Sequence, residues 1–213
     1  MATICWLVLI TNYQLLITLM RLFIALDIDE EIRRRIERFV EGVRGFAPDV
    51  RFVGPQSFHV TLKFLGETNQ VEQIKSVLRD VKVSRFEVTF RGYGFFPGAK
   101  NARVFWAGIE AGPELQELAS AVDTVMTPLG FEREKGPYRP HLTLARSGSG
   151  RPGKIRGDRP NATFAGLEYK LSQLPKPEFG TMTAREFYLY ESKLSPRGAQ
   201  YTKIESFPLA DRS

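Results

Sequence analysis

The chain has 213 residues and is 43% hydrophobic, which is ample apolar material for a globular core and excludes a mainly disordered protein. Its single cysteine, Cys5, excludes an internal disulfide and any zinc site built on cysteines, and it favours a reducing compartment such as the cytoplasm. The formal net charge of +6 at pH 7 favours polyanionic partners.

Residues 1–19 are apolar, but they lack the Lys or Arg that precedes the apolar part of a signal peptide. Residues 11–14 interrupt the apolar run and Arg21 follows it, so the segment falls short of the ~20 apolar residues of a membrane helix. Three interpretations remain: a poor membrane or export segment, an added strand or helix, or codons upstream of a true start at Met20. We favour the third and expect no membrane association, because residues 21–27 already have the pattern of a first strand.

Periodic apolar positions predict the elements of the rest of the chain. In chain order we expect a strand at 21–27, a helix at 29–45, a strand at 58–65, a helix at 69–81, a hairpin of strands at 86–90 and 103–109, a helix at 113–130, a strand at 141–145, a short helix at 164–174 and strands at 179–183, 186–191 and 201–207. Pro113 and Gly130 are placed to begin and end the third helix, and Asn69 with Glu72 resembles a capping box. The charged residues of the first helix are expected to form its solvated face.

The only two histidines of the chain occur in the same tetrapeptide, His-apolar-Thr-Leu, at 59–62 and 141–144. Side chains alternate along a strand, so His59 and Thr61 point to one face, as do His141 and Thr143 in the second motif. Two such strands brought together present two imidazoles and two hydroxyls around one space, without a carboxylate. This set of groups suits an anion, and a phosphodiester before others.

The histidines have three alternative interpretations: a structural role, a metal site, or catalysis by a separate nucleophile. A single strand histidine is usually structural, but the repeat of the whole motif argues against this. Two histidines fall short of the three or four ligands of a zinc site and no carboxylate repeats beside them, so no metal is expected. A Ser or Cys nucleophile is disfavoured, because Cys5 lies in the leader and no Gly-x-Ser-x-Gly sequence is present.

The two motifs lie 82 positions apart, which is too far for one supersecondary unit and suits two lobes of a duplicated architecture. We therefore expect residues 20–213 to form a single bilobal, monomeric domain behind the doubtful leader 1–19.

A basic segment, residues 131–160, surrounds the second motif with eight basic and three acidic residues. Its basic residues are Arg133, Lys135, Arg139, Arg146, Arg151, Lys154, Arg156 and Arg159. Such a rim concentrates nucleic acid near the site, although a solvated surface loop is the alternative. The Gly, Ser, Pro and Arg content of 147–160 predicts a mobile loop.

The chain resembles the RNA 2′,3′-cyclic phosphodiesterase branch of the two-histidine (2H) phosphoesterases, the LigT/ThpR or 2′-5′ RNA ligase family. The resemblance spans Met20 to about Leu209 and is carried by RLFIALDI, FHVTLKFLGE, ARVFWAGI, RPHLTLAR and LYESKLSPRGAQYTKI. Residues 1–19 and the 147–160 loop depart from the family pattern. The resemblance implies an α/β (α+β) fold of two lobes, with two antiparallel sheets flanked by helices around a central cleft with pseudo-twofold symmetry.

The resemblance also implies a reaction, in which a terminal RNA 2′,3′-cyclic phosphate is opened to a 2′-phosphomonoester without metal or cofactor. It assigns His59 as proton donor and His141 as proton acceptor, although the symmetry of the sequence cannot choose between them. Thr61 and Thr143 would hold the non-bridging phosphate oxygens. RNA ends or cyclic nucleotides are therefore the expected partners, and the reverse reaction would join RNA through a 2′-5′ linkage.

Arg146 follows Thr143 by three residues and resembles a family position at the cleft rim, with a phosphate-binding or base-stacking role. On an ideal strand it would face away from His141, so the strand must end or bulge before it. Lys63 would share the face of His59 on a regular strand, and no role is assigned to it.

Two further hypotheses stay open from the sequence. One is a phosphodiesterase for small cyclic or 2′-5′-linked nucleotides, whose activity would not rise with RNA length. The other is a non-catalytic RNA-binding module, which would keep its RNA affinity after loss of both histidines.

Overall fold

The structure is a computed structural model, and it describes residues 19–98, 101–147, 164–195 and 198–211. The expectations for the leader before Leu19, for the loop beyond Ser147 and for the four basic residues at 151–159 lie outside the described residues. Within the described ranges, no helix is long and apolar enough to cross a membrane.

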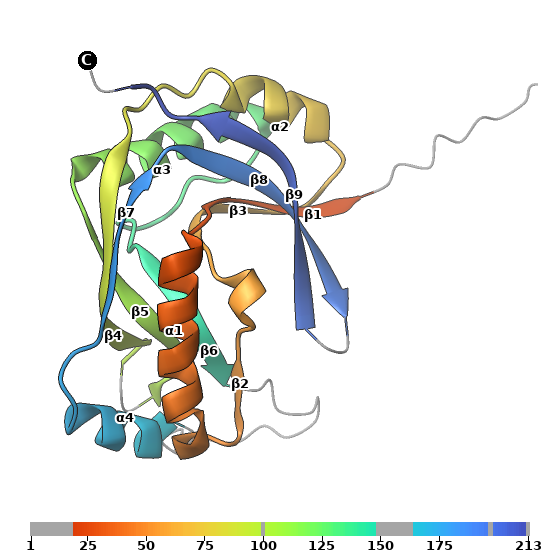
Figure 1. The fold of residues 1–213 in the computed structure, drawn as a ribbon. Helices are drawn as coiled ribbons and strands as arrows, with labels where there is room; N and C mark the ends of the chain where they lie inside the picture. The colour runs from red at the N-terminus through yellow and green to blue at the C-terminus, as the bar shows by residue number, and fades with distance from the viewer. Residues whose placement is uncertain (1–18, 99–100, 148–163, 196–197, 212–213) are drawn as a thin grey trace, which may run out of the picture.

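Nine strands form one antiparallel ladder, in the order β7-β4-β5-β6-β3-β1-β8-β9, with β2 paired to β6 (Figure 1). Their bounds are β1 Met20–Leu26, β2 Val50–Phe52, β3 Val60–Thr68, β4 Phe86–Phe96, β5 Val104–Ala111, β6 His141–Ser147, β7 Glu178–Ala184, β8 Glu186–Ser195 and β9 Gly198–Pro208. The α-helices are α1 Glu30–Val43, α2 Val71–Leu78, α3 Pro113–Met126 and α4 Ala165–Ser172, and 3₁₀ turns lie at Arg44–Phe46, Pro55–Ser57 and Thr127–Leu129.

The ladder has two halves that meet at a single residue pair. The first half contains β9, β8, β1 and β3, and the second contains β6, β5, β4 and β7. Between them, β3 and β6 pair only at Val60 and Leu142. The expected antiparallel α/β fold with helices is confirmed, and its two sheets are the two halves, joined through this pair into one curled ladder (Figure 1).

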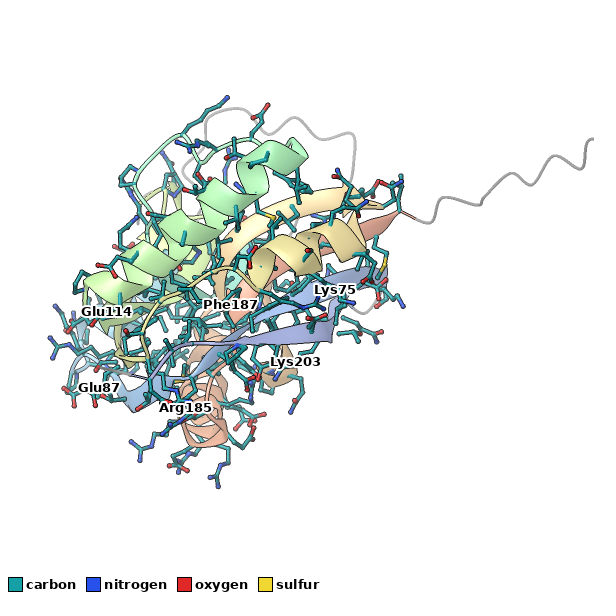
Figure 2. The ribbon with its side chains drawn as sticks, turned by 90° about the horizontal axis from the view of Figure 1, so that it is seen from above. Lys75, Glu87, Glu114, Arg185, Phe187 and Lys203 are labelled. Carbon is teal, nitrogen blue, oxygen red and sulfur yellow. The ribbon has the colours of Figure 1, made fainter. Side chains whose placement is uncertain are left out.

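Each half is covered by a helix that starts from the other half. Helix α1 follows β1 of the first half, but it packs on β7 of the second, where its Phe39 meets Phe179 with ring centroids 5.3 Å apart. Helix α3 follows β5 of the second half, but it packs on β3 of the first. Beside it lies α2, which carries Lys75 (Figure 2). Lys75 Nζ forms an ion pair with the Glu205 carboxylate of β9 at 3.3 Å. The apolar faces of both halves and of the helices thus share one buried core, in which Ile24, Ile36 and Phe90 are fully buried.

The predicted elements are all present, with local corrections. The third helix begins at Pro113, and Gly130 closes the following turn with φ +89°, a left-handed conformation that suits glycine. The capping box prediction is wrong, because Gln70 is the N-cap of α2 and the start of the helix has no side-chain cap. One charged residue of α1 was also misplaced, since Arg33 is buried rather than solvated.

Lys63 lies on the opposite face of β3 from the one expected. Along the β1–β3 pair, Ala25 faces Thr61 and Ile24 faces Lys63, so Leu62 is an extra residue in a β-bulge. The bulge turns Lys63 into the interior below α3, where its Nζ donates to Asp123 Oδ1 at 2.6 Å and to the Glu132 carbonyl at 2.7 Å. Lys63 keeps only 2% of its surface exposed, so both bonds are shielded from water.

We predict that Lys63→Met lowers the free energy of unfolding by about 3 kcal/mol, because it leaves the carboxylate of Asp123 without its buried cation. Urea unfolding followed by circular dichroism measures this loss. Replacing the partner too, in Lys63→Met with Asp123→Leu, should recover part of it, because the unpaired charge is gone. An unchanged unfolding midpoint in the single variant would contradict the structural importance of this ion pair.

Candidate active site

The histidine and threonine side chains of the two repeated motifs are brought together where the two halves meet. Val60 and Leu142 are paired across the antiparallel strands, and both are fully buried in the core. Continuing this register by one residue in each direction sets His59 across from Thr143 and Thr61 across from His141. All four are half-buried and lie on the face opposite the core.

Each imidazole is held by a hydrogen bond of the same kind, from its Nδ1 to a backbone carbonyl two residues earlier. Nδ1 of His59 lies 2.7 Å from the carbonyl oxygen of Ser57, and Nδ1 of His141 lies 2.8 Å from that of Arg139. A carbonyl only accepts, so each Nδ1 carries the proton and donates it. The neutral form of each ring is therefore left with a free lone pair on Nε2, and the charged form with a proton there. Either ring can serve as acid or base at Nε2 without moving.

Aromatic rings surround both histidines and shield them from water. The ring centroid of His59 lies 4.8 Å from that of Phe23 and 5.1 Å from that of Tyr201, while His141 lies edge-on to Phe96 at 5.0 Å. Burial lowers the pKa of His59 to about 4 and also lowers the pKa of His141. The positive charge of Arg146 acts in the same direction on both. At neutral pH both rings are consequently uncharged in the free protein, and an anion bound between them would raise both pKa values.

Arg146 reaches the site through a second β-bulge. Along the β5–β6 pair, Trp106 faces Thr143 and Phe105 faces Ala145, so Leu144 is the extra residue, at the same place in its motif as Leu62 in the first. The bulge returns Arg146 to the face of His141, and its Nη2 lies 3.5 Å from Thr143 Oγ1. The predicted interruption of the strand before Arg146 is confirmed as a bulge.

A buried arginine that the sequence analysis missed fixes the segment before His59. Arg33 of α1 donates to the carbonyl oxygens of Pro55 and Phe58, which flank the turn that leads into His59. It also bonds Asp27 Oδ1 at 2.6 Å. A signal was present, because Arg33, Ile36 and Val40 follow the spacing of the buried stripe, where a charge requires partners.

Asp27 links this arginine to the rim of the site. Its second carboxylate oxygen pairs with Lys203 of β9, which also covers the ring of Tyr188 at 4.0 Å. Burial alone would raise the pKa of Asp27, but its bonds to Lys203 and to the Ile28 backbone N–H hold the pKa below its usual value. Its negative charge raises the pKa of His59 and opposes part of the effect of burial there. Among the described residues, burial and the charge of Arg146 lower the pKa of His141, and its bond to the Arg139 carbonyl opposes them.

The polar groups of the site are imidazole and guanidinium nitrogens and threonine hydroxyls. Among the described residues, no group of three or more His, Cys, Asp or Glu side chains is gathered in a way that could hold a metal ion. The groups that face the motifs are instead suited to a phosphate: hydroxyls that donate, a guanidinium and two imidazoles.

Comparisons with known proteins agree with this arrangement. The model of the 2′-5′ RNA ligase superfamily matches residues 55–164. The RNA 2′,3′-cyclic phosphodiesterase of Methanothermobacter thermautotrophicus is 33% identical over 89% of this chain and 98% of its own length. The enzyme of the same name from Archaeoglobus fulgidus is 34% identical over 88% of this chain and 99% of its own.

Solved structures show the same fold. Crystal structures of Escherichia coli LigT complexed with 3′-AMP and of TT0787 from Thermus thermophilus superpose with TM-scores of 0.71 each, at 25% and 28% identity. Both alignments cover 91% of this chain and the whole of the other. The chain therefore belongs to the 2′-5′ RNA ligase superfamily, whose model spans both of its His-apolar-Thr-Leu motifs.

Proposed function

We propose that this protein is an RNA 2′,3′-cyclic phosphodiesterase that opens a terminal cyclic phosphate to a 2′-phosphomonoester. The observation that carries the proposal is the pair of imidazoles, each fixed through Nδ1 and each presenting Nε2 on the same face as two threonine hydroxyls. The names of the relatives that align over nearly the whole chain support the same reaction.

The reaction needs one neutral imidazole and one protonated imidazole. A neutral ring accepts a proton at Nε2 from the water that attacks phosphorus, while a charged ring donates its Nε2 proton to the departing 3′-oxygen. The bond from phosphorus to the water oxygen forms as the bond to the 3′-oxygen breaks, leaving a 2′-phosphate and a 3′-hydroxyl. We assign His59 as the donor and His141 as the acceptor, as the resemblance to the 2H phosphoesterases implies, and the carboxylate of Asp27 opposes part of the effect of burial on the pKa of His59. With an RNA 5′-hydroxyl in the place of water, the same displacement forms a 2′-5′ linkage.

The remaining groups stabilise the charge of the transition state. Thr61 and Thr143 donate hydroxyl hydrogen bonds to the non-bridging oxygens, where negative charge develops. Arg146 adds a positive charge beside Thr143. Binding of the phosphate also supplies the anion that raises the pKa of the donor histidine enough to keep it protonated.

We expect His59→Ala and His141→Ala each to lower turnover of an RNA with a 2′,3′-cyclic end by about 10²-fold or more, since each removes one partner of the proton transfer. Circular dichroism should show that both variants keep the fold, because neither ring lies in the main core. The product end, identified as a 2′-phosphate by chromatography against authentic 2′- and 3′-phosphate standards, checks the reaction itself.

A metal chelator is the control for this prediction. Ethylenediaminetetraacetate should leave turnover unchanged, because the proposed steps use only imidazoles, hydroxyls and water. Near-normal turnover in either alanine variant would remove the two-histidine mechanism, and retained RNA binding without turnover in the wild type would favour a binding module.

The pH dependence follows from the direction of the two pKa shifts. Activity rises with pH as the acceptor loses its proton and falls as the donor loses its own, which gives a bell. Since burial and Arg146 lower both pKa values in the free protein, the bell of kcat/KM should be centred below pH 6.5. The bell of kcat should lie at higher pH, because bound phosphate raises both values.

Steady-state kinetics on a cyclic mononucleotide between pH 4 and 8 at constant ionic strength tests this expectation. The two fitted values describe the pair and not the separate histidines. A kcat/KM maximum above pH 7 would contradict the shielded environment of the two rings.

Arg33 should affect catalysis as a positioning residue. Arg33→Met removes the bonds to the Pro55 and Phe58 carbonyls, and the loosened segment should misplace His59 and lower kcat about tenfold or more, with little change in KM. The matched control is Arg34→Met on the same helix, whose side chain is 60% exposed and bonds only Glu30 and Glu31 of its own helix among the described residues. Arg33→Lys, which keeps the charge beside Asp27, should recover part of kcat. An equal effect of the two methionine variants at a temperature where both are folded would refute the positioning role.

A further inference from the structure

The bulge in the first motif leaves an aromatic side chain on the face of the catalytic groups. Phe64 follows Thr61 by three residues, the same offset that separates Arg146 from Thr143. In β3 it pairs with Phe23 of β1, so the two side chains share a face. Phe64 keeps 60% of its surface exposed, whereas Phe23 keeps 2%. The chain thus places a phenyl ring in solvent where the other half of the molecule places a guanidinium.

A row of rings connects Phe64 to the site. The ring centroid of Phe23 lies 4.8 Å from that of His59 and 6.1 Å from that of Phe64. Tyr190 stacks on the other side of Phe23 at 4.9 Å, which holds Phe23 in place. The buried ring of Phe23 therefore contacts the imidazole of His59 and lies near the exposed ring of Phe64.

Phe64 is also one wall of a pocket of about 510 Å³, here called the Phe64 pocket. Leu65 and the segment from Gly130 to Lys135 form the rest of its lining. The volume falls within the range of sites for small organic groups. Acidic and basic side chains alternate along the segment, with Glu132 and Glu134 beside Arg133 and Lys135, so its charges balance. A ligand group there is therefore selected by ring contact more than by charge.

The far wall of the pocket is fixed before any ligand binds. Lys63, turned inward by the bulge, binds the Glu132 carbonyl at 2.7 Å, and Asp123 accepts the backbone N–H of Glu134 at 3.3 Å. One buried ion pair thus sets the distance between Phe64 and the opposite segment. A pre-formed gap costs less ordering entropy on binding than one that has to form.

We propose that the Phe64 pocket takes the base of a nucleotide on the 5′ side of the one that carries the cyclic phosphate, stacked on the Phe64 ring. This deepens the proposed function and rests on it. RNA with a cyclic phosphate at its 3′ end continues from the site in the 5′ direction only, and the exposed ring of Phe64 lies beside the buried ring that contacts His59. Aromatic stacking accepts every base, because each has a π-face, and suits unpaired RNA. The protein then contacts single-stranded RNA at two places: the Phe64 pocket and the site that binds the terminal cyclic nucleotide.

The test compares Phe64→Ala with the wild type on a cyclic mononucleotide and on a series of oligomers that end in a 2′,3′-cyclic phosphate. The ratio of kcat/KM for the longer oligomers to that for the mononucleotide should fall about fivefold or more in the variant, as expected for one lost stacking contact. Phe64→Trp should restore the ratio. The matched control is Phe46→Ala, which removes another exposed phenyl ring, 44% exposed, from the 3₁₀ turn after α1.

A double-mutant cycle locates the base. In oligomers with one abasic nucleotide at successive positions, a single position should reduce kcat/KM in the wild type but not further in Phe64→Ala, because the same contact is lost only once. A ratio that is the same in variant and wild type would overturn the proposal while leaving the phosphodiesterase intact. An equal loss on mononucleotide and oligomers would also overturn it, because Phe64 would then act through Phe23 on His59. No turnover of any cyclic-phosphate end by the wild type would overturn the proposed function and this inference together.

Discussion

The architecture depends on one antiparallel contact between two strands, the pairing of Val60 with Leu142. Within the described residues, it is the only residue pair of the ladder between β3 and β6. Because side chains alternate along a strand, burying these two residues in the core forces their neighbours onto the other face. Those neighbours are the histidine and threonine of each motif. The packing that joins the halves is thus the packing that assembles the site, and a shift of register by one residue would bury all four polar side chains.

The leucine that ends each motif has a separate consequence. Leu62 and Leu144 are the extra residues of two bulges at matching positions, and each reverses the direction of the side chains that follow. The reversal buries Lys63 and Ala145, and it brings Phe64 and Arg146 to the site face. A regular strand would have done the opposite, with a lysine beside His59 and a guanidinium in the core. The motif therefore supplies a β-bulge, which changes the face that the following side chains occupy, in addition to its histidine and threonine.

The sequence was sufficient for the elements and for the four motif side chains, because both follow from local periodicity. The sequence also predicts that the strand ends or bulges before Arg146. The same interruption in the first motif is not evident from the sequence, so the face predicted for Lys63 is wrong. Arg33 was missed for a different reason: its partners at Pro55 and Phe58 are more than twenty positions away, and no local pattern reports a backbone carbonyl. The aromatic surroundings of the histidines come from β1, β4 and β9, so their effect on the pKa values depends on tertiary packing.

The two motifs are alike in geometry, so any difference in the roles of their histidines must come from the residues around them. Both imidazoles donate from Nδ1 to the carbonyl two residues earlier, and Arg146 opposes a positive charge on both. The carboxylate of Asp27, which pairs with Arg33 and Lys203, raises the pKa of His59 against the larger effect of burial. An ionised carboxylate stabilises an imidazolium, and its effect grows when substrate excludes water from the site. Arg33 therefore both fixes the backbone before His59 and pairs with the carboxylate of Asp27, whose charge opposes part of the lowering of the His59 pKa by burial.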